Sequence, residues 1–112
     1  MLQLNSVEIR GIVGSVQVGG PENNKVVRFS VATDRIFKGI SGETICETTW
    51  HNVVAFADPD DKDRKDALEL KRCDGVMVKG RLRNVKTVDH ARGIYRETYE
   101  IVAERVELVS HE

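Results

Sequence analysis

Two segments of the sequence place aromatic or basic side chains at every second position. In TTWHNVVAF, residues 48–56, a strand would put Trp50, Asn52, Val54 and Phe56 on one face and His51, Val53 and Ala55 on the other. A strand in a small sheet normally buries one face and exposes the other. If the second set points inward, both large aromatic rings are displayed to a ligand.

The segment VMVKGRLRNVKTV, residues 76–88, alternates in the same way. Its apolar set, which we expect in the core, is Val76, Val78 and Leu82 with Gly80 between them. The opposite set carries the charge and consists of Met77, Lys79, Arg81 and Arg83. A single charged strand face usually does no more than keep a protein soluble, but here an aromatic face accompanies it.

Exposed rings interleaved with cations suit a flexible polyanion that has unpaired bases. Cationic side chains neutralise phosphates and release counterions, and each ring offers a base a stacking surface worth roughly 1 to 3 kcal/mol. The two faces together therefore indicate a surface for a single nucleic-acid strand. The alternative is that the aromatic face is an interface for another protein, because large exposed apolar areas often mark such interfaces.

No group of residues indicates catalysis, a cofactor or a metal ion. His51, His90 and His111 do not fall at ligand spacing with one another or with Cys46 and Cys73. His51 is expected to be a core or subunit-contact residue whose ring is hydrogen-bonded. The run DPDDKD lacks the glycine and trailing glutamate of a calcium loop, and KGISG lacks the lysine and hydroxyl pair of a phosphate loop. We predict a protein that is not an enzyme.

Length and composition set the frame for these motifs. The 112 residues suit one domain spanning 1–112, with 40% apolar and 31% charged residues. A net charge of −1 gives no support to nucleic-acid binding by itself, yet residues 79–97 hold six basic residues against two acidic ones. No apolar run is long enough for a membrane span and the start lacks the order of a signal peptide, so we expect a cytoplasmic protein.

The elements that position these side chains are mostly strands. Alternation and turn residues predict strands over residues 6–14, 26–33, 48–56, 76–88 and 94–109. Residues 58–75 have the charge order and final glycine of a short helix. Two connections, 35–47 and 86–97, are expected to be long, weakly structured loops. Five strands with one short helix between the third and fourth is the layout of an all-β, five-stranded OB-fold barrel.

The same segments also resemble a known family. FSVATDRIF, TTWHNVVAF, VMVKGRLRNVKT and YEIVAERVELV, in this order from about Val7 to Val109, are similar to the bacterial single-stranded DNA-binding (SSB) proteins. The resemblance implies an OB fold, commonly a homotetramer, that wraps single-stranded DNA without sequence preference. It implies roles in DNA replication, repair and recombination. The alternative is a related OB-fold replication-restart (primosome) or assembly subunit that acts mainly through protein contacts.

The resemblance also transfers binding residues to individual positions. Phe37, Trp50 and Phe56 match stacking aromatics of the family, and Arg83 and Lys86 match its basic positions. Asn52 stands where the family can carry arginine and could bond a phosphate or a base edge. Charge and expected facing add further candidates: Arg10, Arg28, Arg35, Lys38, Lys79, Arg81, Arg92, Tyr95 and Arg96.

The chain departs from the family pattern at two places. Thr87 stands where many members have a tryptophan, so one stacking surface is missing and weaker binding or a smaller footprint per subunit is expected. The family usually continues into a flexible tail with an acidic, aromatic tip, whereas this sequence stops at residue 112. It is either a core domain cut from a longer protein or a natural tailless variant, so contacts with other replication and repair proteins stay open.

Overall fold

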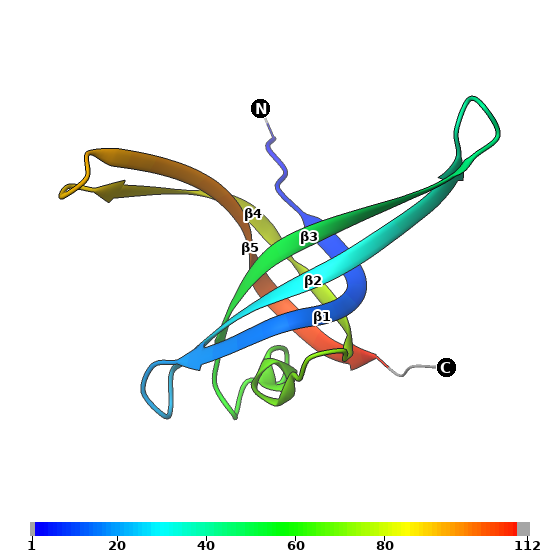
Figure 1. Ribbon diagram of the computed structural model, residues 1–112. Coiled ribbons are helices and arrows are strands. Elements are labelled where there is room, and N and C mark those ends of the chain that lie inside the picture. Colours follow the sequence, from blue (N-terminus) through cyan, green and yellow to red (C-terminus); the bar gives the residue numbers. More distant parts are fainter. Residues whose placement is uncertain (1, 110–112) are drawn as a thin grey trace.

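The computed structural model describes residues 2–109 as a small β barrel from which hairpins project (Figure 1). The barrel strands are β1 (Val7–Gly19), β2 (Lys25–Lys38), β3 (Thr44–Ala57), β4 (Gly75–Asp89) and β5 (Ile94–Val109). A single 3-10 turn, η1 (Lys65–Glu69), lies between β3 and β4. The predictions about His111 and about the chain end at 110–112 lie outside the described residues.

The strands close in the order β1-β2-β3-β5-β4. All neighbours are antiparallel except β3 and β5, which are parallel. β1 closes the barrel by pairing with two strands. Its first half, from Val7 to Ile12, pairs with β4, and its second half pairs with β2 as far as Gly19. This closed sheet with one short helical turn confirms the predicted five-stranded OB fold.

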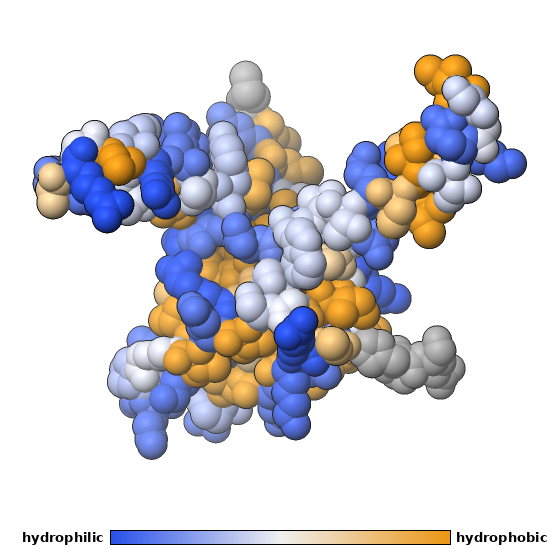
Figure 2. All heavy atoms as spheres, in the orientation of Figure 1, coloured by the Kyte–Doolittle hydropathy of each residue, from blue (hydrophilic) through white to orange (hydrophobic). Residues whose placement is uncertain are grey.

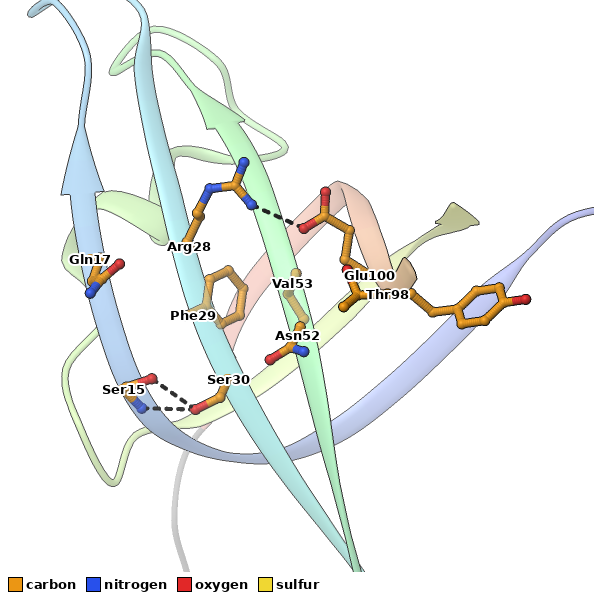
Figure 3. Close-up of a pocket in the computed structure, with 10 residues that line it drawn as sticks. Ser15, Gln17, Arg28, Phe29, Ser30, Asn52, Val53, Thr98 and Glu100 are labelled. Atoms are coloured by element: carbon orange, nitrogen blue, oxygen red, sulfur yellow. Dashed lines mark hydrogen bonds and ion pairs between the residues drawn. The ribbon is translucent and has the colours of Figure 1, made fainter. Parts of the chain in front are cut away.

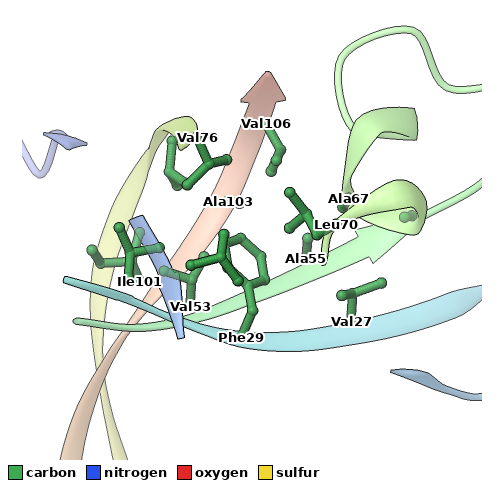
Figure 4. Close-up of a cluster of buried hydrophobic side chains, with 14 residues drawn as sticks. Val27, Phe29, Val53, Ala55, Ala67, Leu70, Val76, Ile101, Ala103 and Val106 are labelled. Carbon is green, nitrogen blue, oxygen red and sulfur yellow. The ribbon is translucent and has the colours of Figure 1, made fainter. Parts of the chain in front are cut away.

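The core fills the barrel with small branched side chains from every strand (Figure 4). Val27 and Phe29 of β2 meet Val53 and Ala55 of β3, and Ile101 follows from β5. Ala67 of η1 and Leu70 just after it cover one end of the barrel. The strands alternate between this core and the outside, as a period of two requires.

Two hairpins extend beyond the barrel as paired strands (Figure 1). We call residues 33–49 the β2–β3 arm and residues 84–99 the β4–β5 arm. The prediction of weakly structured loops at 35–47 and 86–97 is wrong, because strand pairing continues to Lys38↔Thr44 in one arm and to Asp89↔Ile94 in the other. β1 likewise runs on to Gly19, past the expected end at residue 14. Gly39, Gly42 and Gly93 lie in the turns of the two arms, where the ladders end; Figure 2 shows both arms projecting from the barrel. Gly11 and Gly14 lie inside β1, whose pairing with β2 shifts register between Val13 and Val16.

Gly80 marks the place where β4 changes its surroundings. A Cβ on this residue would lie 2.0 Å from the carbonyl oxygen of Val102, so only glycine allows β4 and β5 to approach here. Val76, Val78 and Gly80 are buried as predicted, but Leu82 is 42% exposed and its assignment to the core is wrong. Leu82 keeps the core parity, yet it lies where the strand is already leaving the barrel.

The connection between β3 and β4 is less helical than its charge order predicted. Only residues 65–69 are helical, and Cys73 adopts a positive φ of 77° before β4 begins. Backbone and side-chain bonds fix the connection to β5: Val106 N–H donates to the Asp63 carbonyl at 2.8 Å, and Leu108 N–H donates to the Asp66 carboxylate at 3.1 Å. Hydrogen bonds from the Arg64 side chain lower the pKa of Asp61 within the same turn.

Candidate nucleic-acid interface

Register brings the outward side chains of four strands onto one surface, which we call the outer face. Arg28 of β2 is opposite Val54 of β3, Val54 is opposite Val102 of β5, and Val102 is opposite Arg81 of β4. The next positions along these strands are Ser30 opposite Asn52 and Glu100 opposite Arg83. Trp50 and Phe56 complete the face on β3. Cations from β2 and β4 therefore flank the aromatic strand.

The two aromatic rings of β3 are displayed, as predicted. Trp50 is 60% exposed and Phe56 is 40% exposed, whereas Val53 and Ala55 between them are buried. The Trp50 ring lies across β1 at Gly14, where a Cβ would come within 2.5 Å of the ring carbon Cζ3. Gly14 thus leaves the space that lets the indole lie against the neighbouring strands.

His51 lies on the other side of the strand from Trp50. It is half-buried, and its Nε2 is 2.8 Å from the Thr33 Oγ1, a pair in which the ring tautomer decides the donor. The ring is hydrogen-bonded, in agreement with the structural role expected for it.

A polar pocket of about 330 Å³ opens on the outer face (Figure 3). Its walls come from β1, β2, β3 and β5, and include Ser15, Ser30, Asn52 and Glu100. Ser30 Oγ accepts a hydrogen bond from the Ser15 N–H at 2.9 Å, which ties β1 to β2 next to Trp50. The pocket offers hydroxyl, amide and carboxylate groups to a ligand that lies on the outer face.

Two of the predicted arginines share one carboxylate. Arg28 Nη1 donates to Glu100 Oε2 at 3.0 Å, and Arg83 Nε donates to Glu100 Oε1 at 2.8 Å. The ion pair between Arg28 of β2 and Glu100 of β5 spans β3 (Figure 3). Val54 of β3, which is opposite Arg28, is completely buried although it belongs to the outward set. The charge of these two arginines is therefore partly neutralised within the protein.

Other predicted residues lie on the two arms, and register divides them between faces. In the β2–β3 arm, Lys38 has the parity of Trp50, whereas Arg35 and Phe37 have the parity of the core side. The Arg35 guanidinium lies 5.6 Å from the centre of the Phe37 ring, a cation–π distance. In the β4–β5 arm, Arg96 continues the side of Arg83, and the opposite side carries Lys86 and Tyr95.

The remaining predicted residues are Arg10, Lys79 and Arg92. Arg10 and Lys79 lie along the seam between β1 and β4, in register with Met77 and Glu8, and the structure does not bring them beside Trp50. Arg92 lies in the turn of the β4–β5 arm, 3.9 Å from the Asp89 carboxylate.

Sequence reasoning missed two side chains of this surface. Glu100 had a signal, since it shares the parity of Val102 in the last strand, but acids were not considered as site residues. Tyr99 is 59% exposed and lines the polar pocket, yet its parity is that of the core residue Ile101. Only the departure of the arm from the barrel exposes it, and local alternation does not show that departure.

Among residues 2–109, no group of three histidine, cysteine, aspartate or glutamate side chains is placed to hold a metal ion. No helix in this part of the chain is long and apolar enough to span a membrane.

Comparison with known proteins agrees with the fold and the resemblance. A single-stranded DNA-binding protein from Drosophila melanogaster mitochondria is 35% identical over 105 residues, which cover 92% of this chain and 69% of that protein. The structure of Plasmodium falciparum SSB with ssDNA matches with a TM-score of 0.77 at 22% identity, covering 97% of this chain and 96% of that one. A small single-stranded DNA-binding protein from Streptomyces coelicolor matches with a TM-score of 0.69 at 20% identity, covering 96% of each chain.

These two structural matches support the OB fold. Family membership is shown by the sequence. The profile of the single-strand binding protein family matches residues 4–109, almost the whole chain. A family of binding proteins also confirms the prediction that this protein is not an enzyme. The chain belongs to the single-strand binding protein family.

Proposed function

We propose that this protein binds single-stranded DNA without sequence preference on the outer face. The observation that carries the proposal is the pair of exposed rings, Trp50 and Phe56, on the β3 face that arginines of β2 and β4 flank. The names of the relatives support it, since the fly protein is a single-stranded DNA-binding protein and the Plasmodium protein is in complex with ssDNA. Roles in replication, repair and recombination follow from the same binding activity.

The geometry suits stacking without base selection. Trp50 and Phe56 are six positions apart on β3, which is about 20 Å at about 3.3 Å per residue, so the two rings stack on different bases. Every base has an aromatic face, and stacking on it does not depend on sequence. The two arms add Phe37, Lys38, Lys86, Tyr95 and Arg96 as further contacts with the strand.

The test is a titration with a long oligothymidylate at two salt concentrations, followed by the fluorescence of Trp50, the only tryptophan. We expect strong quenching and near-stoichiometric binding that weakens as salt rises. A DNA duplex of equal phosphate concentration is the control and should give little quenching. Absence of binding at low salt would contradict the proposal and would favour an assembly module that acts through protein contacts.

We also propose a homo-oligomer, with a tetramer as the expected state, so that several outer faces join into one DNA path. Exposed apolar side chains on β1 and β5 support this, because Ile12 and Leu108 are 43% and 38% exposed. Light scattering coupled to gel filtration should give four times the 12.6 kDa chain mass. A monomer mass would exclude the joined path.

The cytoplasmic location is kept as a proposal. The alternative is an organellar location, because the fly relative is a mitochondrial protein. Fractionation of cells that express the tagged full-length protein distinguishes a cytoplasmic from an organellar location.

A further inference from the structure

We propose that Glu100 is an internal counter-ion that competes with DNA phosphates for Arg28 and Arg83 and so limits the affinity and salt dependence of binding. This inference rests on the proposed function, because it concerns the strength of binding on the outer face. It assigns a role in DNA binding to an acidic residue, which a simple count of cations would leave out.

The geometry shows that the carboxylate occupies an anion site between two cations. Glu100 Oε2 accepts an N–H from Arg28 Nη1 at 3.0 Å, and Glu100 Oε1 accepts two from Arg83, from Nε at 2.8 Å and from Nη2 at 2.5 Å. The Glu100 side chain is 11% exposed, whereas Arg28 and Arg83 are 56% and 37% exposed. The carboxylate is therefore largely buried, whereas both arginine side chains remain partly exposed to a ligand.

Charge arithmetic then gives the consequence for DNA binding. Two arginines and one carboxylate carry a net charge of +1, so the three residues together attract about one phosphate instead of two. Salt dependence measures this number, because log K falls with log salt by about 0.7 for each phosphate that is neutralised on a single strand. A phosphate that approached both arginines would also have to displace the Glu100 carboxylate from them or share them with it.

The trio lies where DNA must pass under the proposed function. Glu100 lines the polar pocket together with Asn52 and Ser30, on the same face as Trp50. The arginines come from β2 and β4, on either side of the β3 and β5 pair. Glu100 consequently acts at the centre of the outer face and not at its rim.

The experiment compares Glu100→Gln with the unchanged protein on oligothymidylate over a range of salt concentrations, followed by Trp50 fluorescence. We expect the salt slope to become steeper by about 0.7 and binding at 0.1 M salt to become about 3 to 10 times tighter. The matched control is Glu69→Gln, which removes the same charge from an exposed position on η1, outside the outer face, and should leave the slope unchanged. An unchanged slope or weaker binding for Glu100→Gln overturns the proposal.

A second probe separates competition for phosphate from contact with a base. On a methylphosphonate oligothymidylate, whose backbone is uncharged, Glu100→Gln should gain nothing over the unchanged protein. A gain that persists on this probe shows that Glu100 acts on the bases and overturns the proposal. If the unchanged protein binds neither DNA probe, the proposed function itself fails, which is a different result.

The single substitution places two arginines side by side, so a charge-balanced variant guards against misfolding. Arg28→Ala combined with Glu100→Gln removes one cation and one anion and leaves Arg83 free. Its slope should match that of the unchanged protein, whereas Arg28→Ala alone should flatten the slope by about 0.7. Equal slopes for Arg28→Ala and for the double variant would overturn the proposal. Circular dichroism checks that each variant is folded.

Discussion

The edge of the Trp50 ring reaches across β2 to Gly14 of β1, at a place where a Cβ atom would stand 2.5 Å from Cζ3. Gly14 has no positive φ, so an alanine would fit the backbone, but its Cβ would displace both the ring and the Ser30 hydroxyl, whose Oγ would be 2.7 Å away. The glycine thus sets the position of the exposed indole on the outer face.

Gly14→Ala should therefore change DNA binding more than it changes folding. We expect a shifted Trp50 emission spectrum and weaker binding to oligothymidylate, with a loss of stability within about 1 kcal/mol because the displaced ring is already exposed. Emission spectra, titration and urea unfolding check the three parts. Normal binding with an unshifted spectrum would show that the ring is not held at this place.

Removing either ring should weaken binding without changing its salt slope. Trp50→Ala and Phe56→Ala should each cost about 1 to 3 kcal/mol of binding free energy, because stacking is lost while the cations stay. Fluorescence anisotropy of a labelled oligothymidylate measures affinity in variants that lack Trp50. A flattened slope would mean that the rings order the cations instead of stacking on bases.

The same ring variants should remain folded, since Trp50 is 60% and Phe56 40% exposed. Val53→Ala is the matched control on β3, because Val53 is 2% exposed and packs in the core. Urea unfolding should show a larger loss of stability for Val53→Ala than for either ring variant. The reverse order would contradict the facing of β3.

Two arginines on different parts of the barrel should differ in their effect on salt dependence. Arg81 is 51% exposed on the outer face, and its contact with Glu104 is long, at 4.0 Å. Arg10 lies on β1, at the seam between β1 and β4. Its partner on β4 is Met77, which is four positions before Arg81. Arg81→Ala should flatten the salt slope by about 0.7, and Arg10→Ala should change it less.

Parallel salt titrations of the two arginine variants measure this difference. Equal slopes would mean that the DNA path includes the seam between β1 and β4 as well as the outer face. The original prediction, in which both residues bind nucleic acid, would then stand.

Gly80→Ala should destabilise the barrel, because its Cβ would lie 2.0 Å from the backbone oxygen of Val102 and two strands would have to separate. We expect a loss of about 1 to 3 kcal/mol, measured by urea unfolding, as for other overpacked sites. Gly19→Ala is the control, since a Cβ there meets nothing within 4 Å. A neutral Gly80→Ala would show that β4 and β5 can move apart freely.

Local alternation was enough to predict the number of strands and the facing of most of their side chains. A strand places successive side chains on opposite faces whatever surrounds it, so Trp50 and Phe56 could be assigned to one face and Val53 and Ala55 to the other. The five-strand order with one helical turn then followed from turn residues and glycines.

Features that depend on closure of the barrel were decided by the tertiary structure alone. Alternation does not indicate where β4 and β5 leave the barrel, so Leu82 was assigned to the core and Tyr99 was not recognised as exposed. It also does not indicate which strands become neighbours, and the parallel pairing of β3 with β5 is what brings Glu100 within reach of Arg28, 72 residues away in the sequence. The sequence by itself determined which side chains share a face of each strand, because alternation is a local property of the backbone. Only the closed barrel decided which charges on those faces meet one another, because contacts between distant strands depend on their order and register.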